Sequence, residues 1–289
     1  MLKRIAGKAA SPALARLYWP SYARQARRLG LDRLYLILSF DCDTPQDAEA
    51  ATRLDPWLRE RGIKATYAVP GETLQQGAAS YHRLAADGAE FINHGALPHT
   101  EWRGGRYWSI TFYHAMSPQD VAADIRRGHH IVADVIGRPP VGFRAPHFGL
   151  FQRPAQLRLQ YDTLRELGYH YSTSTMPRFA MRRGPVFDVG GLWEIPLSGT
   201  YRQPFRVFDS WSYLRSPQDR VLKGQYSRAF IHTVDRLLAR RIPGVLNYYV
   251  DPAHVVESAA FRQAIEHVVT RQIPTLHYTE LLAMIRGQP

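Results

Sequence analysis

Short apolar runs alternate along the chain with longer stretches in which apolar residues recur at helical spacing. The apolar run at 36–40 is followed at 47–61 by a stretch in which Ala51, Leu54 and Leu58 fall on one helical face. Residues 63–71 and 89–93 predict two more strands, with a helix at 78–87 between them. This alternation predicts an α/β fold whose parallel strands are joined by right-handed crossovers.

The same rhythm continues to the C-terminus. Ser117 and Pro118 predict the start of a helix that runs to Gly137, because serine is a good N-cap and proline fits the first helical position. Further strands are predicted at 139–149, 169–173, 192–197 and 245–254, with a helix at 227–241 and a last strand and helix at 273–285. Residues 101–116 are too rich in aromatic residues and glycine for a regular crossover and predict an inserted loop.

Acidic and histidine residues follow the ends of the first and third predicted strands. Asp41 and Asp43 end the run at 36–43, and His94 and His99 follow the strand at 89–93. The carboxyl ends of parallel strands meet at one edge of a sheet, where α/β proteins bind ligands. One histidine alone is more often structural, but two imidazoles beside a carboxylate are typical of a catalytic zinc or related divalent site. Arg144, at a later strand end, is expected beside these acids.

Cys42, the single cysteine, lies between the two aspartates. Because side chains alternate along a strand, Cys42 is expected to point into the core, away from Asp41 and Asp43. One cysteine excludes an intrachain disulfide framework and favours a reducing compartment.

Positive charge is concentrated in the first 33 residues. The chain has a net charge of +12, and residues 1–33 carry eight basic residues against Asp32 alone. Apolar residues are interleaved with this charge: Leu14, Leu17, Tyr18, Trp19 and Tyr22. Residues 1–33 are therefore a basic N-terminal extension that either contacts an anionic membrane surface or forms a solvated helix packed loosely on the domain. We do not expect nucleic acid as a partner, because no nucleic-acid-binding motif accompanies the charge.

No segment approaches the roughly 20 apolar residues of a membrane span. The first thirty residues also lack the apolar stretch of a signal peptide. We therefore expect a cytoplasmic protein, with residues 1–33 able to hold it at the inner face of the membrane.

An ordered set of motifs resembles the NodB-type polysaccharide deacetylases, carbohydrate esterase family 4, in the branch that uses Asp-x-Asp. The motifs are 39–43 (Ser-Phe-Asp-Cys-Asp), 88–94 with His99, the helix at 117–137, 143–146 (Phe-Arg-Ala-Pro), 167–172 and 192–196 (Leu-Trp-Glu-Ile-Pro). The resemblance implies a distorted (β/α) barrel of about seven parallel strands in a catalytic domain at 34–289, closed by the elements at 273–285. It also implies metal-dependent hydrolysis of an N-acyl group on an amino sugar.

The resemblance also implies roles for single residues. Asp41 corresponds to the general base and Arg144 to the group that orients it, while Asp43, His94 and His99 correspond to ligands of a divalent metal, with zinc as the first candidate. The family usually has one residue fewer between its two histidines, so the loop at 95–98 must bulge for His99 to reach the metal.

The position of the general acid departs from the family pattern. The family carries a strand that ends in a histidine, which acts as the acid. Here Asp251 precedes Pro252, and His254 lies three residues after Asp251. Three alternatives remain: His254 is the acid, Asp251 orients another group, or the segment is a structural turn.

Two functions are compatible with the sequence. The first is a cytoplasmic hydrolase that removes an acetyl or formyl group from an amino sugar, nucleotide- or lipid-linked, during the biosynthesis of a surface polysaccharide, lipopolysaccharide or glycolipid. A non-sugar amide is an open alternative substrate in the same fold. The second is a non-catalytic carbohydrate-binding or scaffold protein, which the altered histidine spacing and the Asp251-Pro252 segment motivate.

Overall fold

The computed structural model describes residues 12–216, 218 and 220–287. Lys3, Arg4 and Lys8 of the predicted basic extension lie outside the described residues. None of the described helices combines the length and the apolar character that a membrane span requires.

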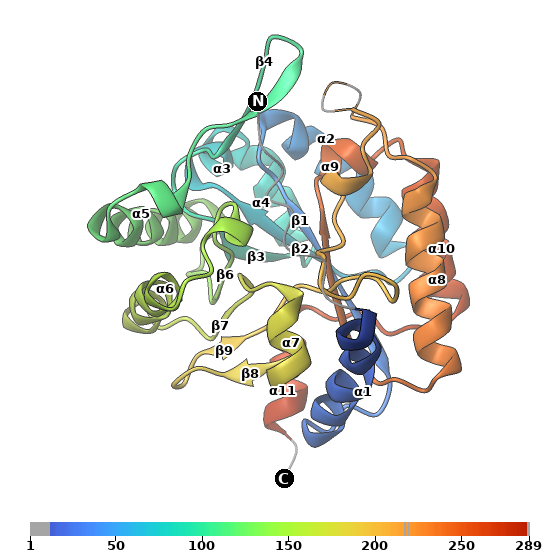
Figure 1. Cartoon of the computed structure of the whole chain (residues 1–289). Coiled ribbons are helices and arrows are strands. Elements are labelled where there is room, and N and C mark those ends of the chain that lie inside the picture. Colours follow the sequence, from blue (N-terminus) through green and yellow to red (C-terminus); the bar gives the residue numbers. More distant parts are fainter. Residues whose placement is uncertain (1–11, 217, 219, 288–289) are drawn as a thin grey trace.

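In the described part of the chain, the main sheet has eight strands in the order β10-β1-β2-β3-β6-β7-β9-β8 (Figure 1). Their bounds are β1 Leu34–Asp41, β2 Ala65–Val69, β3 Glu90–Asn93, β6 Gly142–Phe143, β7 Tyr171–Ser172, β8 Phe187–Asp188, β9 Trp193–Glu194 and β10 Gly244–Val250. Every pairing from β10 to β9 is parallel, and only β8 is antiparallel to its neighbour. The curled sheet confirms the predicted barrel-like fold with about seven parallel strands.

An irregular segment after β9 joins the two ends of the curled sheet. The Ser198 amide donates to the carbonyl of Asn247 on β10 at 2.9 Å, and the Asn247 amide donates to the Ser198 hydroxyl at 3.0 Å. Of the last strand and helix predicted at 273–285, the helix is present as α11 Tyr278–Arg286, while the strand is reduced to a bridge between Thr275 and Leu36 of β1.

Helices surround the sheet, and Figure 1 shows α5 and α6 on one flank and α8 and α10 on the other. Their bounds are α1 Pro12–Arg28, α2 Pro45–Arg59, α3 Gly71–Gln76, α4 Ala78–Ala86, α5 Pro118–Ile136, α6 Pro154–Glu166, α7 Pro177–Arg183, α8 Gln225–Ala239, α9 Pro252–Val255, α10 Ala259–Thr270 and α11 Tyr278–Arg286, with 3₁₀ turns η1 Tyr113–Ala115, η2 Phe148–Leu150 and η3 Trp211–Tyr213. The start of α5 confirms the sequence signal, because the Ser117 hydroxyl accepts a hydrogen bond from the Asp120 amide at 3.1 Å.

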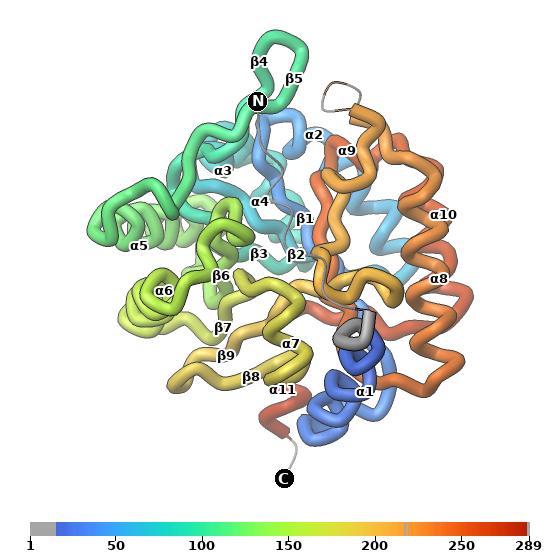
Figure 2. Tube along the Cα trace, viewed as in Figure 1, coloured from blue at the N-terminus to red at the C-terminus, as the bar shows by residue number. Residues whose placement is uncertain are grey.

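Helix α1 is an integral part of the core, next to β10 and α7 (Figure 2). The Tyr22 hydroxyl donates to the carbonyl of Val245 at 2.6 Å and accepts from the amide of the same residue at 2.9 Å. Tyr18 and Trp19 are also buried. The prediction that these three aromatic residues face a membrane, or pack only loosely, is therefore wrong, because the fold itself covers them.

The inserted segment forms a hairpin where we predicted a loop. Strands β4 Thr100–Arg103 and β5 Arg106–Ser109 are joined by Gly104 and Gly105, whose φ angles are 59° and 76°. Two consecutive residues with positive φ favour the turn type that matches the twist of a hairpin. The hairpin projects from one end of the barrel (Figure 1).

Candidate metal and catalytic site

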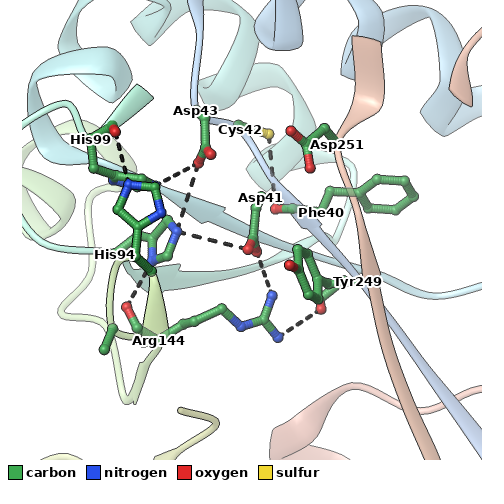
Figure 3. A network of polar contacts seen from close by, with 12 residues as sticks. Phe40, Asp41, Cys42, Asp43, His94, His99, Arg144, Tyr249 and Asp251 are labelled. Carbon is green, nitrogen blue, oxygen red and sulfur yellow. Dashed lines mark hydrogen bonds and ion pairs between the residues drawn. The ribbon is translucent and has the colours of Figure 1, made fainter. Parts of the chain in front are cut away.

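The carboxyl ends of β1 and β3 bring the predicted metal ligands together. Asp41 ends β1, Asp43 follows it, and His94 comes directly after β3. The Nε2 atoms of His99 and His94 lie 2.9 Å and 3.7 Å from Oδ1 of Asp43 (Figure 3). One ligand atom from each of these three buried residues lies within 4.8 Å of the others. The Cys42 side chain between the aspartates is buried, which confirms its predicted place in the core.

Hydrogen bonds orient two of these side chains from behind. Oδ2 of Asp43 accepts from the Thr100 hydroxyl at 3.2 Å, which leaves Oδ1 toward the histidines. Nδ1 of His94 lies 2.7 Å from the carbonyl oxygen of Arg144. Because a carbonyl only accepts, Nδ1 carries the proton and the lone pair of Nε2 faces Asp43, as in histidines that bind metals.

The loop between the two histidines is fixed by the buried carboxylate of Asp124 on α5. That carboxylate accepts hydrogen bonds from the Ala96 amide at 3.2 Å, the Leu97 amide at 2.9 Å and the Tyr113 hydroxyl at 2.7 Å. Gly95 has a φ of 80°, a conformation that glycine adopts without strain. These contacts explain how the loop at 95–98 delivers His99 to Asp43.

The three side chains offer a cation one carboxylate and two imidazole nitrogens. Burial acts to raise the pKa of Asp43, but the facing His99 and His94 outweigh it and hold that pKa below its ordinary value. Burial, together with the charge of His99, lowers the pKa of His94 well below its usual range, so this imidazole is neutral. A buried carboxylate facing two imidazole nitrogens is a donor set that binds zinc and related divalent ions, and these residues therefore fit such an ion.

Asp41 belongs to a separate pair with Arg144. The guanidinium is fully buried, and its Nη1 donates to Oδ1 of Asp41. Burial raises the pKa of Asp41 to about 6, with Arg144 opposing the shift and the neighbouring Asp43 adding to it. Asp41 Oδ2 also lies 3.8 Å from Nε2 of His94, so the Asp41–Arg144 pair adjoins the Asp43–His94–His99 group.

These groups open into a cavity of about 210 Å³. It is lined by Asp41, Asp43, His94, His99, Thr100, Ser109, His147, Phe148, Trp211 and Tyr249. The predicted insertion thus lies over the site, through Thr100 and Ser109 of the hairpin. Aromatic side chains form much of the wall, which suits a flat apolar face such as that of a sugar ring.

His147 is a cavity residue that we did not predict as a site residue. Its Nε2 donates to the carbonyl oxygen of His99 at 3.0 Å, its ring stacks on Phe112 at 4.7 Å, and its φ of 44° is unusual for a residue other than glycine. Burial first, and then the charge of His99, lower the pKa of His147 to about 4. Its position directly after Arg-Ala-Pro, at the end of a predicted strand, was a signal that could have identified it.

Asp251 and His254 follow β10 and do not line this cavity. Nδ1 of His254 is 2.9 Å from the Ser210 hydroxyl and 3.7 Å from Oδ2 of Asp251. The His254 ring meets Trp211 edge to face at 4.7 Å and Tyr107 at 5.3 Å. Burial, followed by Arg220, lowers the pKa of His254 to about 3, and burial with the nearby aspartates raises the pKa of Asp251 well above its ordinary value.

Most of the predicted site residues fall in a region that matches a known protein family. The sequence profile of the polysaccharide deacetylases matches residues 31–171, which include Asp41, Asp43, His94, His99 and Arg144. Residues 31–171 are similar to the polysaccharide deacetylases. The family match confirms the resemblance seen in the sequence motifs and supports carbohydrate deacetylation in general as the activity. Asp251 and His254 lie outside the matched residues.

Solved structures share the fold over nearly the whole chain. A Mycobacterium smegmatis protein assigned to the polysaccharide deacetylases has a TM-score of 0.66 and 17% identity, with 89% of this chain and 91% of that chain covered. A Pseudomonas aeruginosa PAO1 protein with the same assignment has a TM-score of 0.66 and 14% identity, with coverages of 94% and 95%. PuuE allantoinase has a TM-score of 0.66 and 11% identity, with coverages of 89% and 90%. No curated protein matches the chain.

Proposed function

We propose that the protein is a metal-dependent amidohydrolase that removes an acetyl or formyl group from the nitrogen of an amino sugar. The observation that carries this proposal is the convergence of Asp43, His94 and His99 beside the Asp41–Arg144 pair, in a cavity with aromatic walls. This arrangement separates a set of cation ligands from a second carboxylate that is free to accept a proton.

The roles proposed for the residues follow from their contacts. A divalent cation held by Asp43, His94 and His99, with zinc as the first candidate, would polarise the acyl oxygen and lower the pKa of the attacking water. Asp41 accepts the proton of that water, because its carboxylate faces the cavity and the buried guanidinium of Arg144 fixes one of its oxygens. Arg144 in turn keeps Asp41 from rotating toward the cation ligands.

The departing amine needs a proton, and we assign its donation to His254, whose ring contacts Trp211 of the cavity wall. Because burial lowers the pKa of His254 to about 3, the ring is neutral in the free protein and must take up the proton after the substrate binds. The Nδ1 side of this ring faces Ser210 and Asp251, while its buried Nε2 has no hydrogen-bond partner among the described residues. A ring that is fixed through one nitrogen, with the other nitrogen available, is the arrangement of histidines that transfer protons. Asp251 then orients His254 and is not itself the donor.

We further propose that the substrate is an intermediate of surface-polysaccharide, lipopolysaccharide or glycolipid biosynthesis, linked to a nucleotide or a lipid and met in the cytoplasm or at the inner face of the membrane. The excess of basic residues supports a substrate or surface that carries phosphate. On α1, Arg24, Arg27 and Arg28 are exposed, so any contact with an anionic membrane is electrostatic and does not use the buried aromatic residues.

A non-catalytic carbohydrate-binding role receives less support. The longer histidine spacing was one of its two motives, yet His99 reaches Asp43 at 2.9 Å. The segment at Asp251 still differs from the family pattern, so the role of His254 needs a test of its own.

The experiment is acyl release by the purified full-length chain. Protein stripped with a chelator and reloaded with Zn²⁺ is incubated with N-acetylglucosamine oligomers, an N-formylated amino sugar and allantoin, and free acetate, formate and allantoate are measured. We expect acetate or formate release that requires the metal and is lost in Asp41→Asn, with metal content unchanged. No bound metal, hydrolysis that survives Asp41→Asn, or hydrolysis of allantoin alone would overturn the proposal.

A further inference from the structure

The first residue of the last helix reaches the centre of the barrel. Tyr278 opens α11, far outside the residues that match the family, and its side chain is fully buried. Its hydroxyl accepts a hydrogen bond from Nη2 of Arg144 at 2.8 Å, and it lies 2.6 Å from Oδ1 of Asn247. The helix at the end of the chain therefore contacts the arginine that pairs with Asp41.

The direction of these hydrogen bonds is fixed by Asn247. Nδ2 of Asn247 donates to the carbonyls of Ile195 at 3.0 Å and Pro196 at 3.2 Å. Carbonyls accept only, so the amide cannot be flipped and its Oδ1 must face Tyr278. The Tyr278 hydroxyl consequently donates its single proton to Asn247 and offers its lone pairs to Arg144.

Tyr278 is one of two acceptors for the same guanidinium nitrogen. Nη2 of Arg144 also donates to the Ser39 hydroxyl at 2.8 Å, so both of its hydrogens are used, while Nη1 donates to Asp41. A planar guanidinium with its outer nitrogen held at two points cannot rotate away from Asp41. Without Tyr278, one hydrogen of a fully buried cation would have no acceptor.

The position of Tyr278 is set by a second buried carboxylate, at the opposite end of β3 from His94. Glu90 accepts hydrogen bonds from the backbone amides of Tyr278 at 3.0 Å and Thr279 at 3.1 Å. A carboxylate at the first amide groups of a helix is favourable because those groups have no partner within the helix. The Tyr278 ring also stacks on Tyr171, with centroids 5.0 Å apart.

We propose that Tyr278 is a positioning residue that holds Arg144 in the orientation that pairs with Asp41, and that α11 is thereby part of the catalytic apparatus. The catalytic consequence rests on the proposed function, whereas the effect on Arg144 does not. Tyr278 does not contact the cavity and acts only through the guanidinium.

The test compares Tyr278→Phe with Tyr171→Phe in the full-length, zinc-loaded protein. Tyr171 is a matched control, because it is the buried ring stacked on Tyr278 and its hydroxyl is not bonded to Arg144. We expect Tyr278→Phe to lower kcat about 10-fold to 100-fold, the size of a hydrogen bond to a charged group, with KM and metal content unchanged. Tyr171→Phe should stay within about twofold of wild type. Ser39→Ala removes the other acceptor of Nη2 of Arg144 and should also lower kcat.

A spectroscopic readout separates this inference from the proposed function. Hindered rotation of a clamped guanidinium gives separate Nη1 and Nη2 signals in ¹⁵N-detected NMR, and Arg144→Lys identifies those of Arg144. We expect separate signals in the wild type and in Tyr171→Phe, and merged signals in Tyr278→Phe. Unchanged signals in Tyr278→Phe, or equal effects of the two tyrosine substitutions on kcat, would overturn the inference. Absence of acyl release by the wild type would overturn the proposed function, while the NMR comparison would still decide the role of Tyr278.

Discussion

The two parts of the proposed catalytic site are built in different ways. On the metal side, Asp43, His94 and His99 are carried by strand ends and a loop. The Thr100 hydroxyl donates to Asp43, the Arg144 carbonyl accepts from His94, and the Asp124 carboxylate accepts from the loop before His99. On the acid side, His254 and Asp251 lie beyond β10, held by Ser210 and covered by rings from the hairpin and from η3. The metal side is thus a product of the regular barrel, whereas the acid side depends on irregular segments that come from distant parts of the chain.

The largest expected effect is the loss of a metal ligand. His94→Ala should abolish acyl release and weaken Zn²⁺ binding by more than the roughly 10- to 100-fold that loss of a supporting contact causes. Metal content after dialysis, with activity on the same samples, measures this effect. His130→Ala on the exposed face of α5 is the matched control. Stoichiometric zinc in His94→Ala would show that the metal side is not where the ion binds.

The acid side is tested by a substitution that should leave the metal in place. We expect His254→Gln to lower kcat by about 10²- to 10⁴-fold, the usual contribution of general acid catalysis, with the zinc content of the wild type. His147→Gln is the comparison, because His147 lines the cavity and bonds to the His99 carbonyl. If His147→Gln lost the activity and His254→Gln kept it, the acid would have to be reassigned to His147.

The difference between the two sides also explains what could be predicted from the sequence. Parallel strands must bring their carboxyl ends to one edge, so the positions of Asp41, Asp43, His94 and Arg144 followed from strand patterns and motifs. Nothing in the local pattern reveals that Asp124 anchors the loop before His99, or that Ser210 contacts His254, because both contacts join segments far apart in the sequence. The aromatic face of α1 has the same pattern whether it meets a membrane or the core, and only the packing against β10 decides between them.

A smaller effect is expected when a contact that holds the metal ligands in place is removed. Asp124→Asn removes the carboxylate that accepts from Ala96, Leu97 and Tyr113, so the loop that carries His99 should become less ordered. We expect zinc affinity to fall about 10- to 100-fold, as it does when contacts behind metal ligands are removed. Competition with a chromogenic chelator measures the affinity. Asp134→Asn, on the exposed face of the same helix, should bind zinc like the wild type. Equal affinities for the two variants would mean that the loop holds its shape without Asp124.

The smallest effect is expected at Tyr107, whose ring packs over His254. The Tyr107 ring packs against Trp211 at 4.6 Å and His254 at 5.3 Å, while its buried hydroxyl has no hydrogen-bond partner among the described residues. Tyr107→Phe should therefore keep kcat within about twofold, because the ring contacts persist. Tyr107→Ala removes those contacts and should lower kcat about 2- to 10-fold, as expected from the free energy of one aromatic pair. Steady-state kinetics on both variants measures the difference. A larger loss in Tyr107→Phe would mean that the hydroxyl contacts the substrate, and the hairpin would then belong to the binding site itself.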